Sequence, residues 1–355
     1  MIIYDDKKYI LDEVKTSIFL VITQKCNLRC KYCYESLNYP NNAMSWDNLK
    51  KILFIIKDIP KLDLTFFGGE PTLEYEKIDY VINQLKDRAT YSIITNGYKI
   101  EHLIPYFKKW QEYGSSLQVS YDFEPLQSKN RIDAKIILEN IKKLAQENID
   151  FSIKSTIPIN DLIHIKQVYF DFQKTRQELL EINPNTSISL SETIAQSNKE
   201  NDITNIIPTF REQMQDIVQD ALKRDKPRFS FFQQAKVFCS IGDNFISIDY
   251  NGDVYLCQHF LFNKEHCIGN IFNTPLSSLL RKKPWSGKIP KECKSCSVCY
   301  CSPCSANSFF LSKKENFNDR ILDYSVDKSR CNINKIISEY SYAYKKLKKE
   351  RLNGI

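Results

Sequence analysis

The twelve cysteines of this 355-residue chain are distributed very unevenly. Three lie in the segment CNLRCKYCY at residues 26–34, none lies between residues 33 and 239, and nine lie between residues 239 and 331. Cysteines that only packed a core would be scattered along the chain, and a disulfide framework is typical of much shorter secreted proteins. The two groups therefore predict metal binding or catalysis in a reducing compartment.

The chain lacks the signals of export and membrane insertion. It contains no run of about 18 apolar residues, and its first ten residues are partly acidic, unlike a signal peptide. We therefore expect a soluble, cytoplasmic protein with no membrane partner. The net charge of +7 comes largely from lysine-rich patches, which we interpret as solvated helix ends, and no motif predicts nucleic-acid binding.

The first two-thirds of the chain alternates short apolar runs with amphipathic stretches. The runs that predict strands are residues 19–22, 62–67, 91–95, 117–121, 151–157 and 187–190. Between residues 46 and 58 the apolar positions share one helical face, and Ser45 is a suitable N-cap. Six strand–helix repeats predict a parallel sheet curved into a barrel or partial barrel. Ligands bind at the carboxyl ends of such strands, where the first cysteine group lies.

A different pattern begins after residue 225. Helical periodicity fades, and the segment NFISIDYNGDVYLC predicts a β-hairpin with an Asn-Gly turn. Such a small, loop-rich region needs cross-links to fold. We therefore divide the chain into an N-terminal segment (1–16), an α/β core (17–225), a small cysteine-rich domain (226–331) and a C-terminal helix (332–355).

The spacing of Cys26, Cys30 and Cys33 restricts the possible metal. A structural zinc site closes its shell with four ligands, commonly as two CxxC pairs. A 4Fe–4S cluster usually takes four thiolates, so three leave one iron open to an amine and a carboxylate of a small molecule. The alternative is a three-cysteine zinc site that a distant histidine completes.

The segment CNLRCKYCY closely resembles the cluster loop of radical S-adenosylmethionine (SAM) enzymes, with Tyr32 in the usual aromatic position. Three further segments match in order: FFGGEP at 66–71, IITNG at 93–97 and VSYDFEP at 119–125. The resemblance implies a 4Fe–4S cluster on Cys26, Cys30 and Cys33, with SAM on its open iron. The reduced cluster would cleave SAM to a 5′-deoxyadenosyl radical that abstracts hydrogen from a substrate.

The same resemblance assigns residues to the SAM site. Gly68, Gly69 and Glu70 would bind the amino group of SAM, and Thr95 and Asn96 would lie near the ribose. Ser120 and Asp122 would face SAM or substrate. Asp122, Lys154 and Tyr121 are the candidates for substrate contact or proton transfer.

The cysteine-rich region resembles the SPASM extension of radical SAM enzymes that modify peptides and proteins. The implied fold is a partial (β/α)6 TIM-like barrel of the radical SAM type, followed by a SPASM domain and a C-terminal helix. Two auxiliary 4Fe–4S clusters are implied. Their ligands would be Cys239, Cys257 and Cys304 for the first, and Cys293, Cys296, Cys301 and Cys331 for the second.

The spacing departs from the family pattern in two places. Cys299 is extra and is an alternative ligand to Cys301. Either Cys267 supplies the fourth ligand of the first auxiliary cluster, or that cluster keeps an open iron. Without the N-terminal loop, the CxxC spacings in CKSCSVC would indicate zinc ribbons.

The SPASM resemblance suggests a maturase that acts on a ribosomal precursor peptide, with an oxidative side-chain cross-link as the favoured product. Its partners would be the peptide and a flavodoxin- or ferredoxin-type one-electron reductant. Because the cluster loop begins at Cys26 and leaves no room for an N-terminal leader-binding domain, a leader would be recognised by a separate leader-binding protein, by the substrate-binding face itself or around the C-terminal helix. Gln258 follows Cys257 where sulfatase maturases carry an aspartate. The alternatives are a sulfatase-type or cofactor-precursor maturase, a peptide epimerase using a free thiol such as Cys267 or Cys299, and a non-catalytic zinc-binding module.

Overall fold

The computed structural model describes residues 15–33, 41–186, 188–194, 202–224, 227, 229–232, 244–280, 293, 296, 298, 301, 305–312 and 326–352. Its centre is a curved sheet of parallel strands, each hydrogen-bonded to the next. These strands are β1 (Thr16–Thr23), β2 (Leu62–Gly68), β3 (Ala89–Thr95), β4 (Ser115–Ser120), β5 (Phe151–Ile157) and β6 (Ile188–Ile194). The parallel α/β partial barrel expected from the sequence is therefore confirmed.

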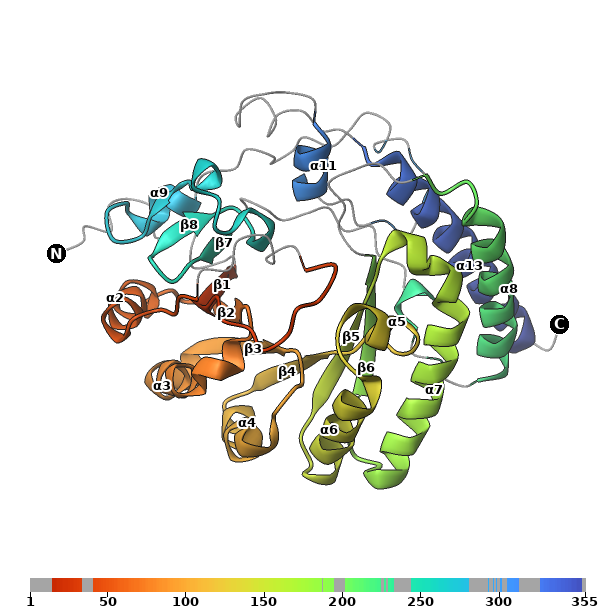
Figure 1. Ribbon diagram of the computed structural model, residues 1–355, viewed down its shortest axis with the longest axis horizontal. Helices are drawn as coiled ribbons and strands as arrows, with labels where there is room; N and C mark the ends of the chain where they lie inside the picture. Colours follow the sequence, from red (N-terminus) through yellow and green to blue (C-terminus); the bar gives the residue numbers. More distant parts are fainter. Residues whose placement is uncertain are drawn as a thin grey trace.

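Helices cover the outer face of this sheet (Figure 1). They are α2 (Trp46–Ile56), α3 (Tyr75–Leu85), α4 (Ile104–Glu112), α6 (Ala134–Gln146), α7 (Ile165–Ile182) and α8 (Ile207–Lys223). The short helix α5 (Leu126–Asn130) belongs to the connection after β4. The predicted cap of α2 is present, because Ser45 Oγ accepts a hydrogen bond of 3.1 Å from Asn48 N. Its apolar face, which includes Leu49 and Ile52, is fully buried against the sheet.

The two faces of the sheet carry different side chains. In β5, Ile153 and Ser155 are buried on the helix-covered face, whereas Lys154 and Thr156 alternate with them and are only half-buried. The inner face therefore carries polar groups toward the carboxyl ends of the strands. Across β1 and β2, Phe19 and Phe67 pack on this face with their ring centroids 5.4 Å apart.

The region after residue 243 extends the same sheet. Strand β7 (Phe245–Ile248) pairs in parallel with β1, in a register that places Ser17 opposite Phe245. Strands β8 (Asp253–Tyr255) and β9 (Gly269–Asn270) continue it in antiparallel fashion. The predicted hairpin is thus confirmed, and it is joined edge-to-edge to the barrel. The short helices α9 (Leu276–Leu280) and α11 (Ser305–Leu311) follow.

The C-terminal helix α13 (Lys328–Leu352) lies beside α8 (Figure 1). The ring of Tyr344 stacks on Phe232 at 4.4 Å, and Arg211 of α8 pairs with Glu339 at 2.6 Å. The helix begins earlier than the pattern from residue 332 suggested, so Cys331 lies in its first turn. The domain boundaries chosen from the sequence remain predictions. Among the residues described, no helix has the length and apolar character needed to cross a bilayer.

Candidate active site

The loop that carries the first three cysteines follows β1 at the carboxyl edge of the sheet. Its first residues lie against the end of β2: Gly69 N donates to Thr23 O at 2.9 Å, and Glu70 N donates to Lys25 O at 2.8 Å. A Cβ atom on Gly69 would lie 2.3 Å from the carbonyl oxygen of Lys25. Only glycine therefore permits this approach, and the GGE segment sets the starting position of the cluster loop.

The three thiols share one short loop. Cys33 N donates to Cys30 O at 3.1 Å, and Leu28 N donates to Cys26 Sγ at 3.4 Å. Burial raises the pKa of Cys26 to about 11, and the negative charge of Glu70 adds to the shift. Such a thiol is neutral near pH 7 and becomes a thiolate only when a metal displaces its proton. The loop therefore supplies three thiols, the donor groups that an iron–sulfur cluster needs.

Tyr32 anchors the cysteine loop to the end of β4. Its hydroxyl donates to Asp122 Oδ2 and accepts a bond of 3.0 Å from Arg131 Nη1. The neighbouring Lys31 N donates to Asn130 O at 2.8 Å. Burial raises the pKa of Tyr32, and the nearby Asp122 carboxylate adds to this shift, so the hydroxyl keeps its proton.

Arg131 was not identified from the sequence. It also lies close enough to Cys30 to oppose the rise that burial causes in the pKa of that thiol. No short motif marks it, because it follows the predicted Ser-x-Asp segment in an irregular stretch between α5 and α6. Its contacts connect the cluster loop to the second half of the barrel.

Glu70 lies in a buried network between the ends of β2 and β3. Its carboxylate accepts bonds of 2.7 Å from both Asn96 N and Thr72 Oγ1. The side chain of Asn96 in turn donates to Asn27 Oδ1 in the cluster loop at 2.7 Å. Thr95 Oγ1 accepts from Gly97 N at 3.2 Å. The structure thus brings the GGE segment, the TNG segment and the cluster loop together.

The remaining candidates fall into two places. Ser120 and Lys154 are register partners on neighbouring strands β4 and β5, and both are half-buried on the inner face. Asp122 is fully buried, and its Oδ1 accepts a bond of 2.8 Å from Thr156 N. Tyr121 lies in the hydrophobic core, with its ring 4.7 Å from that of Phe123, and is not on the inner face.

Three other cysteines of the C-terminal region lie near Cys301. Burial raises the pKa of Cys301, and the charges of Cys331, Cys293 and Cys296 add to the shift, so these thiols lie within electrostatic range of Cys301. Among the described residues, however, no group of His, Cys, Asp or Glu is close enough together to hold a metal ion as it stands. Asn334 Nδ2 lies 3.7 Å from Cys301 Sγ. Cys239, Cys299 and Cys304 lie outside the described residues.

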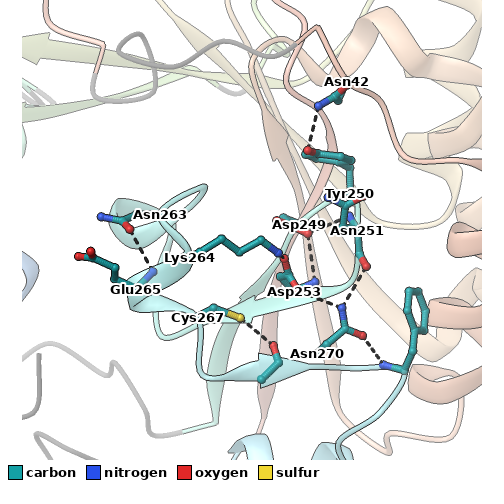
Figure 2. Close-up of polar contacts among 12 residues, drawn as sticks. Asn42, Asp249, Tyr250, Asn251, Asp253, Asn263, Lys264, Glu265, Cys267 and Asn270 are labelled. Carbon is teal, nitrogen blue, oxygen red and sulfur yellow. Dashed lines mark hydrogen bonds and ion pairs between the residues drawn. The ribbon is translucent and has the colours of Figure 1, made fainter.

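Cys257 and Cys267 lie on the hairpin side of this region. Cys257 is buried at the start of a 3₁₀ turn, Gln258–Phe260, where its Sγ accepts from His259 N at 3.3 Å. Cys267 Sγ donates to Gly269 O at 3.1 Å (Figure 2). Cys267 is not among the thiols that affect the pKa of Cys301.

Figure 2 shows the polar contacts that order the hairpin. The Asp249 carboxylate accepts bonds from Asn251 N at 2.8 Å and Asp253 N at 3.1 Å. Tyr250 Oη accepts a bond of 2.9 Å from Asn42 Nδ2, and Asn42 O accepts one from Gln24 N at 2.8 Å. Because Gln24 precedes the cluster loop, these bonds connect the hairpin with that loop.

Two family models match the chain in consecutive regions. Residues 20–162 match the Radical SAM superfamily model, and residues 239–305 match the SPASM model, described as an iron–sulfur cluster-binding domain. A radical SAM domain uses a 4Fe–4S cluster and SAM, and a SPASM domain binds auxiliary iron–sulfur clusters. These matches therefore confirm the kinds of cofactor expected from the sequence: a 4Fe–4S cluster with SAM, and auxiliary iron–sulfur clusters.

Several curated proteins are similar to parts of the chain. An S-adenosylmethionine-dependent nucleotide dehydratase of Fibrobacter sp. (strain UWH6) is 30% identical over 155 residues, which is 39% of this chain and 46% of that protein. The chain thus spans less than half of that relative. A tungsten-containing aldehyde ferredoxin oxidoreductase cofactor-modifying protein of Pyrococcus furiosus is 25% identical, covering 71% of this chain and 74% of that protein.

Solved structures share the fold at low sequence identity. Native anSMEcpe with bound AdoMet superposes with a TM-score of 0.71 and 17% identity, covering 94% of this chain and 99% of that chain. Streptococcus suis SuiB bound to its precursor peptide SuiA gives a TM-score of 0.57 and 16% identity, covering 86% and 75%. The family models therefore identify residues 20–162 as a radical SAM domain and residues 239–305 as a SPASM domain, and the solved structures show the same fold over most of the chain.

Proposed function

We propose that this chain is a maturase that modifies a ribosomally made precursor peptide by an oxidative cross-link between side chains. Two of the structures that share its fold hold peptides: SuiB with its precursor peptide SuiA, and anSMEcpe with the Cp18Cys peptide. The Pyrococcus furiosus relative is named for modifying a cofactor, which keeps a cofactor precursor as the second candidate.

One observation carries the proposal. Among the described residues, a single loop with three thiols lies at the carboxyl edge of the barrel, and the GGE segment contacts its first residues. Cys26, Cys30 and Cys33 would bind the cluster and leave one iron for SAM. When bound, the cluster and SAM supply a carbon-centred radical that removes a hydrogen atom from the substrate.

The protein's own residues would bind and orient SAM. The backbone of Gly68 and Gly69 would approach its amino group, with Glu70 keeping this segment and Asn96 in place through their hydrogen bond. Thr95 and Asn96 would lie beside the ribose. Ser120, on the inner face, would face SAM or substrate, and Asp122 would hold Tyr32 and the cluster loop in position.

An oxidative cross-link also needs an acceptor for the electron that leaves the substrate. The group formed by Cys293, Cys296, Cys301 and Cys331 fits one auxiliary cluster. Cys257 would serve another, with Cys239 and Cys304. A flavodoxin- or ferredoxin-type protein would supply the starting electron, and a separate protein would bind the leader. We place the enzyme in the cytoplasm, where thiolates remain reduced.

Cys30→Ala tests the site. The anaerobically reconstituted variant should produce no 5′-deoxyadenosine from SAM and dithionite, yet keep the iron and sulfide of the C-terminal region. The matched control is Cys267→Ala, which lies far from the loop in the chain and should retain SAM cleavage. Production of 5′-deoxyadenosine by Cys30→Ala at the wild-type rate would refute the assignment.

Mass spectrometry tests the product. The chain should be co-expressed with each short peptide encoded beside it, and the peptide weighed. Loss of two hydrogens supports the cross-link. A mass that is unchanged in ordinary water but rises by one deuterium when the reaction is run in heavy water would identify an epimerase instead. Peptides that remain unmodified although an active reductant is present would contradict the peptide proposal.

A further inference from the structure

Three phenylalanine rings form a line across the inner face of the sheet, which we call the aromatic row. Phe245 of β7, Phe19 of β1 and Phe67 of β2 belong to three neighbouring strands. The ring centroid of Phe19 lies 5.2 Å from that of Phe245 and 5.4 Å from that of Phe67. All three side chains are only half-buried, whereas Ile18 and Leu20 on the helix-covered face of β1 are fully buried. The row therefore presents apolar surface to the inside of the barrel.

The strand registers show that the aromatic row runs obliquely toward the carboxyl edge of the sheet. Phe245 lies level with the start of β1. Phe19 is farther along β1, and Phe67 is the register partner of Val21, two residues beyond Phe19. Phe67 also directly precedes Gly68, the first residue of the GGE segment. One end of the row therefore adjoins the segment that would bind SAM.

The inward-facing side chains at the level of Phe67 change in character around the barrel. Ile94 of β3 lies beside Phe67, one residue beyond the paired positions Phe66 and Ile93. Ile94 is the register partner of Gln118 in β4, and the next strand, β5, places a serine beside Gln118. A closed TIM barrel fills such layers with bulky branched side chains. Here only the side formed by β1, β2 and β3 is apolar, and the opposite side offers small or polar groups.

Two polar side chains on the inner face lack a hydrogen-bond partner within the described part of the chain. Ser247 of β7 is the register partner of Phe19, and its hydroxyl is fully buried and unpaired there. The side-chain amide of Gln118, which is half-buried, makes no hydrogen bond there either. Leaving a buried hydroxyl unpaired is costly, so a polar atom of a bound molecule beside the row would stabilise Ser247.

We propose that the aromatic row binds an aromatic side chain of the substrate peptide, from Phe, Tyr or Trp. The identification as a peptide residue rests on the proposed function. Aromatic rings prefer tilted or edge-to-face contacts with centroids about 4.5–7 Å apart, and a bound ring would extend the spacing already present in the row. An aliphatic side chain would gain only the contact area. The adenine of SAM is the competing aromatic group.

The position of the row gives the bound residue a role in selectivity. Because the row adjoins the GGE segment at Phe67, a seated ring would hold the peptide in a fixed register relative to SAM. The peptide main chain would then face the polar side of the barrel, where Gln118 and Ser120 lie on the inner face of β4. The ring would thereby select which peptide position meets the radical.

The test uses the full chain, anaerobically reconstituted, and needs no turnover. The probes are the capped tripeptide acetyl-Ala-Phe-Ala-amide and its leucine counterpart, with binding followed by ligand-observed NMR. Wild-type protein should bind the phenylalanine probe at least about threefold more tightly. Phe19→Leu should abolish this preference and still bind the leucine probe, which shows that the variant is folded. Phe54→Leu is the matched control, because the Phe54 ring is 64% exposed on α2, and it should behave as wild type.

Two results would overturn the proposal. One is equal affinity of the wild type for both probes, and the other is a phenylalanine preference that survives in Phe19→Leu. A SAM titration separates the two aromatic groups. Saturating SAM should leave the affinity for the phenylalanine probe unchanged, whereas displacement of the probe by SAM would assign the row to adenine and overturn the peptide subsite.

A photolabelling experiment avoids any effect of substitution on folding. Wild-type protein irradiated with acetyl-Ala-(4-benzoylphenylalanine)-Ala-amide should be labelled in β1, β2 or β7. Excess phenylalanine probe should suppress this labelling more strongly than excess leucine probe. Labelling confined to other segments would contradict the proposal. An aromatic preference without any peptide product in co-expression would leave the subsite standing and refute only the proposed cross-linking reaction.

Discussion

Tyr32 donates its hydroxyl proton to Asp122, which is 90 residues away in the sequence, and Arg131 donates to the same hydroxyl. Tyr32→Phe removes the hydroxyl that Asp122 and Arg131 share, so the buried carboxylate and guanidinium each lose a hydrogen-bond partner. We expect a loss of about 1–3 kcal/mol in the free energy of unfolding. Hydrogen exchange of the peptide that spans residues 26–33 should accelerate severalfold.

The matched control for this change is Tyr113→Phe, at the end of α4 and remote from the loop. It should leave exchange in residues 26–33 unchanged. If both variants exchange at the wild-type rate, Tyr32 does not anchor the loop.

Gly69→Ala should prevent the cluster loop from closing on β2. The added Cβ would meet the carbonyl oxygens of Lys25 and Gln24 at 2.3 and 2.5 Å, and backbone atoms cannot move away cheaply. We expect reduced iron incorporation and a lower Tm. Gly114→Ala is the comparison, because Gly114 has φ +72° and open space around it. Its cost should be about 1–2 kcal/mol without loss of iron. Full iron loading of Gly69→Ala would contradict the close approach.

Glu70→Gln should weaken the link between β2 and β3. In the wild type the two carboxylate oxygens of Glu70 accept from Thr72 and Asn96. Glutamine replaces one of these oxygens with an NH2 group, so one of the two buried donors loses its acceptor. The expected loss is about 1–3 kcal/mol, measured by anaerobic urea unfolding. Glu147→Gln removes a carboxylate that pairs with Lys108 at the surface, and its effect on the free energy of unfolding should be much smaller because solvent screens the pair. Equal stability of the two variants would argue against the buried network.

Asp249 should make stability depend on pH. Burial raises its pKa from 3.8 to about 6, against hydrogen bonds that lower it. The unfolded chain therefore releases this proton at lower pH than the folded one, and stability is lost as pH rises toward 6. Asp249→Asn keeps the acceptor oxygen and removes the titration. Between pH 5 and 7 the wild type should lose about 1 kcal/mol more than the variant. Parallel stability profiles would refute the raised pKa.

Cys301→Ala should remove one auxiliary cluster. Because Cys301 lies with Cys293, Cys296 and Cys331, its loss should lower the iron content by about four atoms per chain. Combined with Cys30→Ala, the losses should add, because the two clusters use different thiols. An unchanged iron content would indicate that Cys299 takes its place.

The barrel and most of the site follow from local patterns in the sequence. Alternating apolar runs predict strands because one face of each strand packs on helices, and Ser45 predicts the start of α2 because its hydroxyl accepts from the first turn. The segments at residues 26–34 and 66–71 predict the cluster loop and its support because glycine and cysteine are chemically specific there.

The contacts of Arg131 and Arg330 could not be predicted in this way. Each depends on a partner far away in the chain: Tyr32 for Arg131, and Ile194 for Arg330. An arginine in an irregular stretch has no periodicity that shows which way its guanidinium points. The pairing of β7 with β1 was missed for the same reason, since the change of pattern after residue 225 suggested only a separate domain.

The β1–β7 ladder limits how the enzyme can move. Swinging the hairpin region away from the barrel as a rigid body would break the hydrogen bonds that pair Ser17 with Phe245 and Leu20 with Ile248. The spacing between the radical-generating centre and the hairpin that carries Cys257 should therefore stay constant through the reaction cycle. An electron that passes between these two regions would then cross the same distance in every turnover.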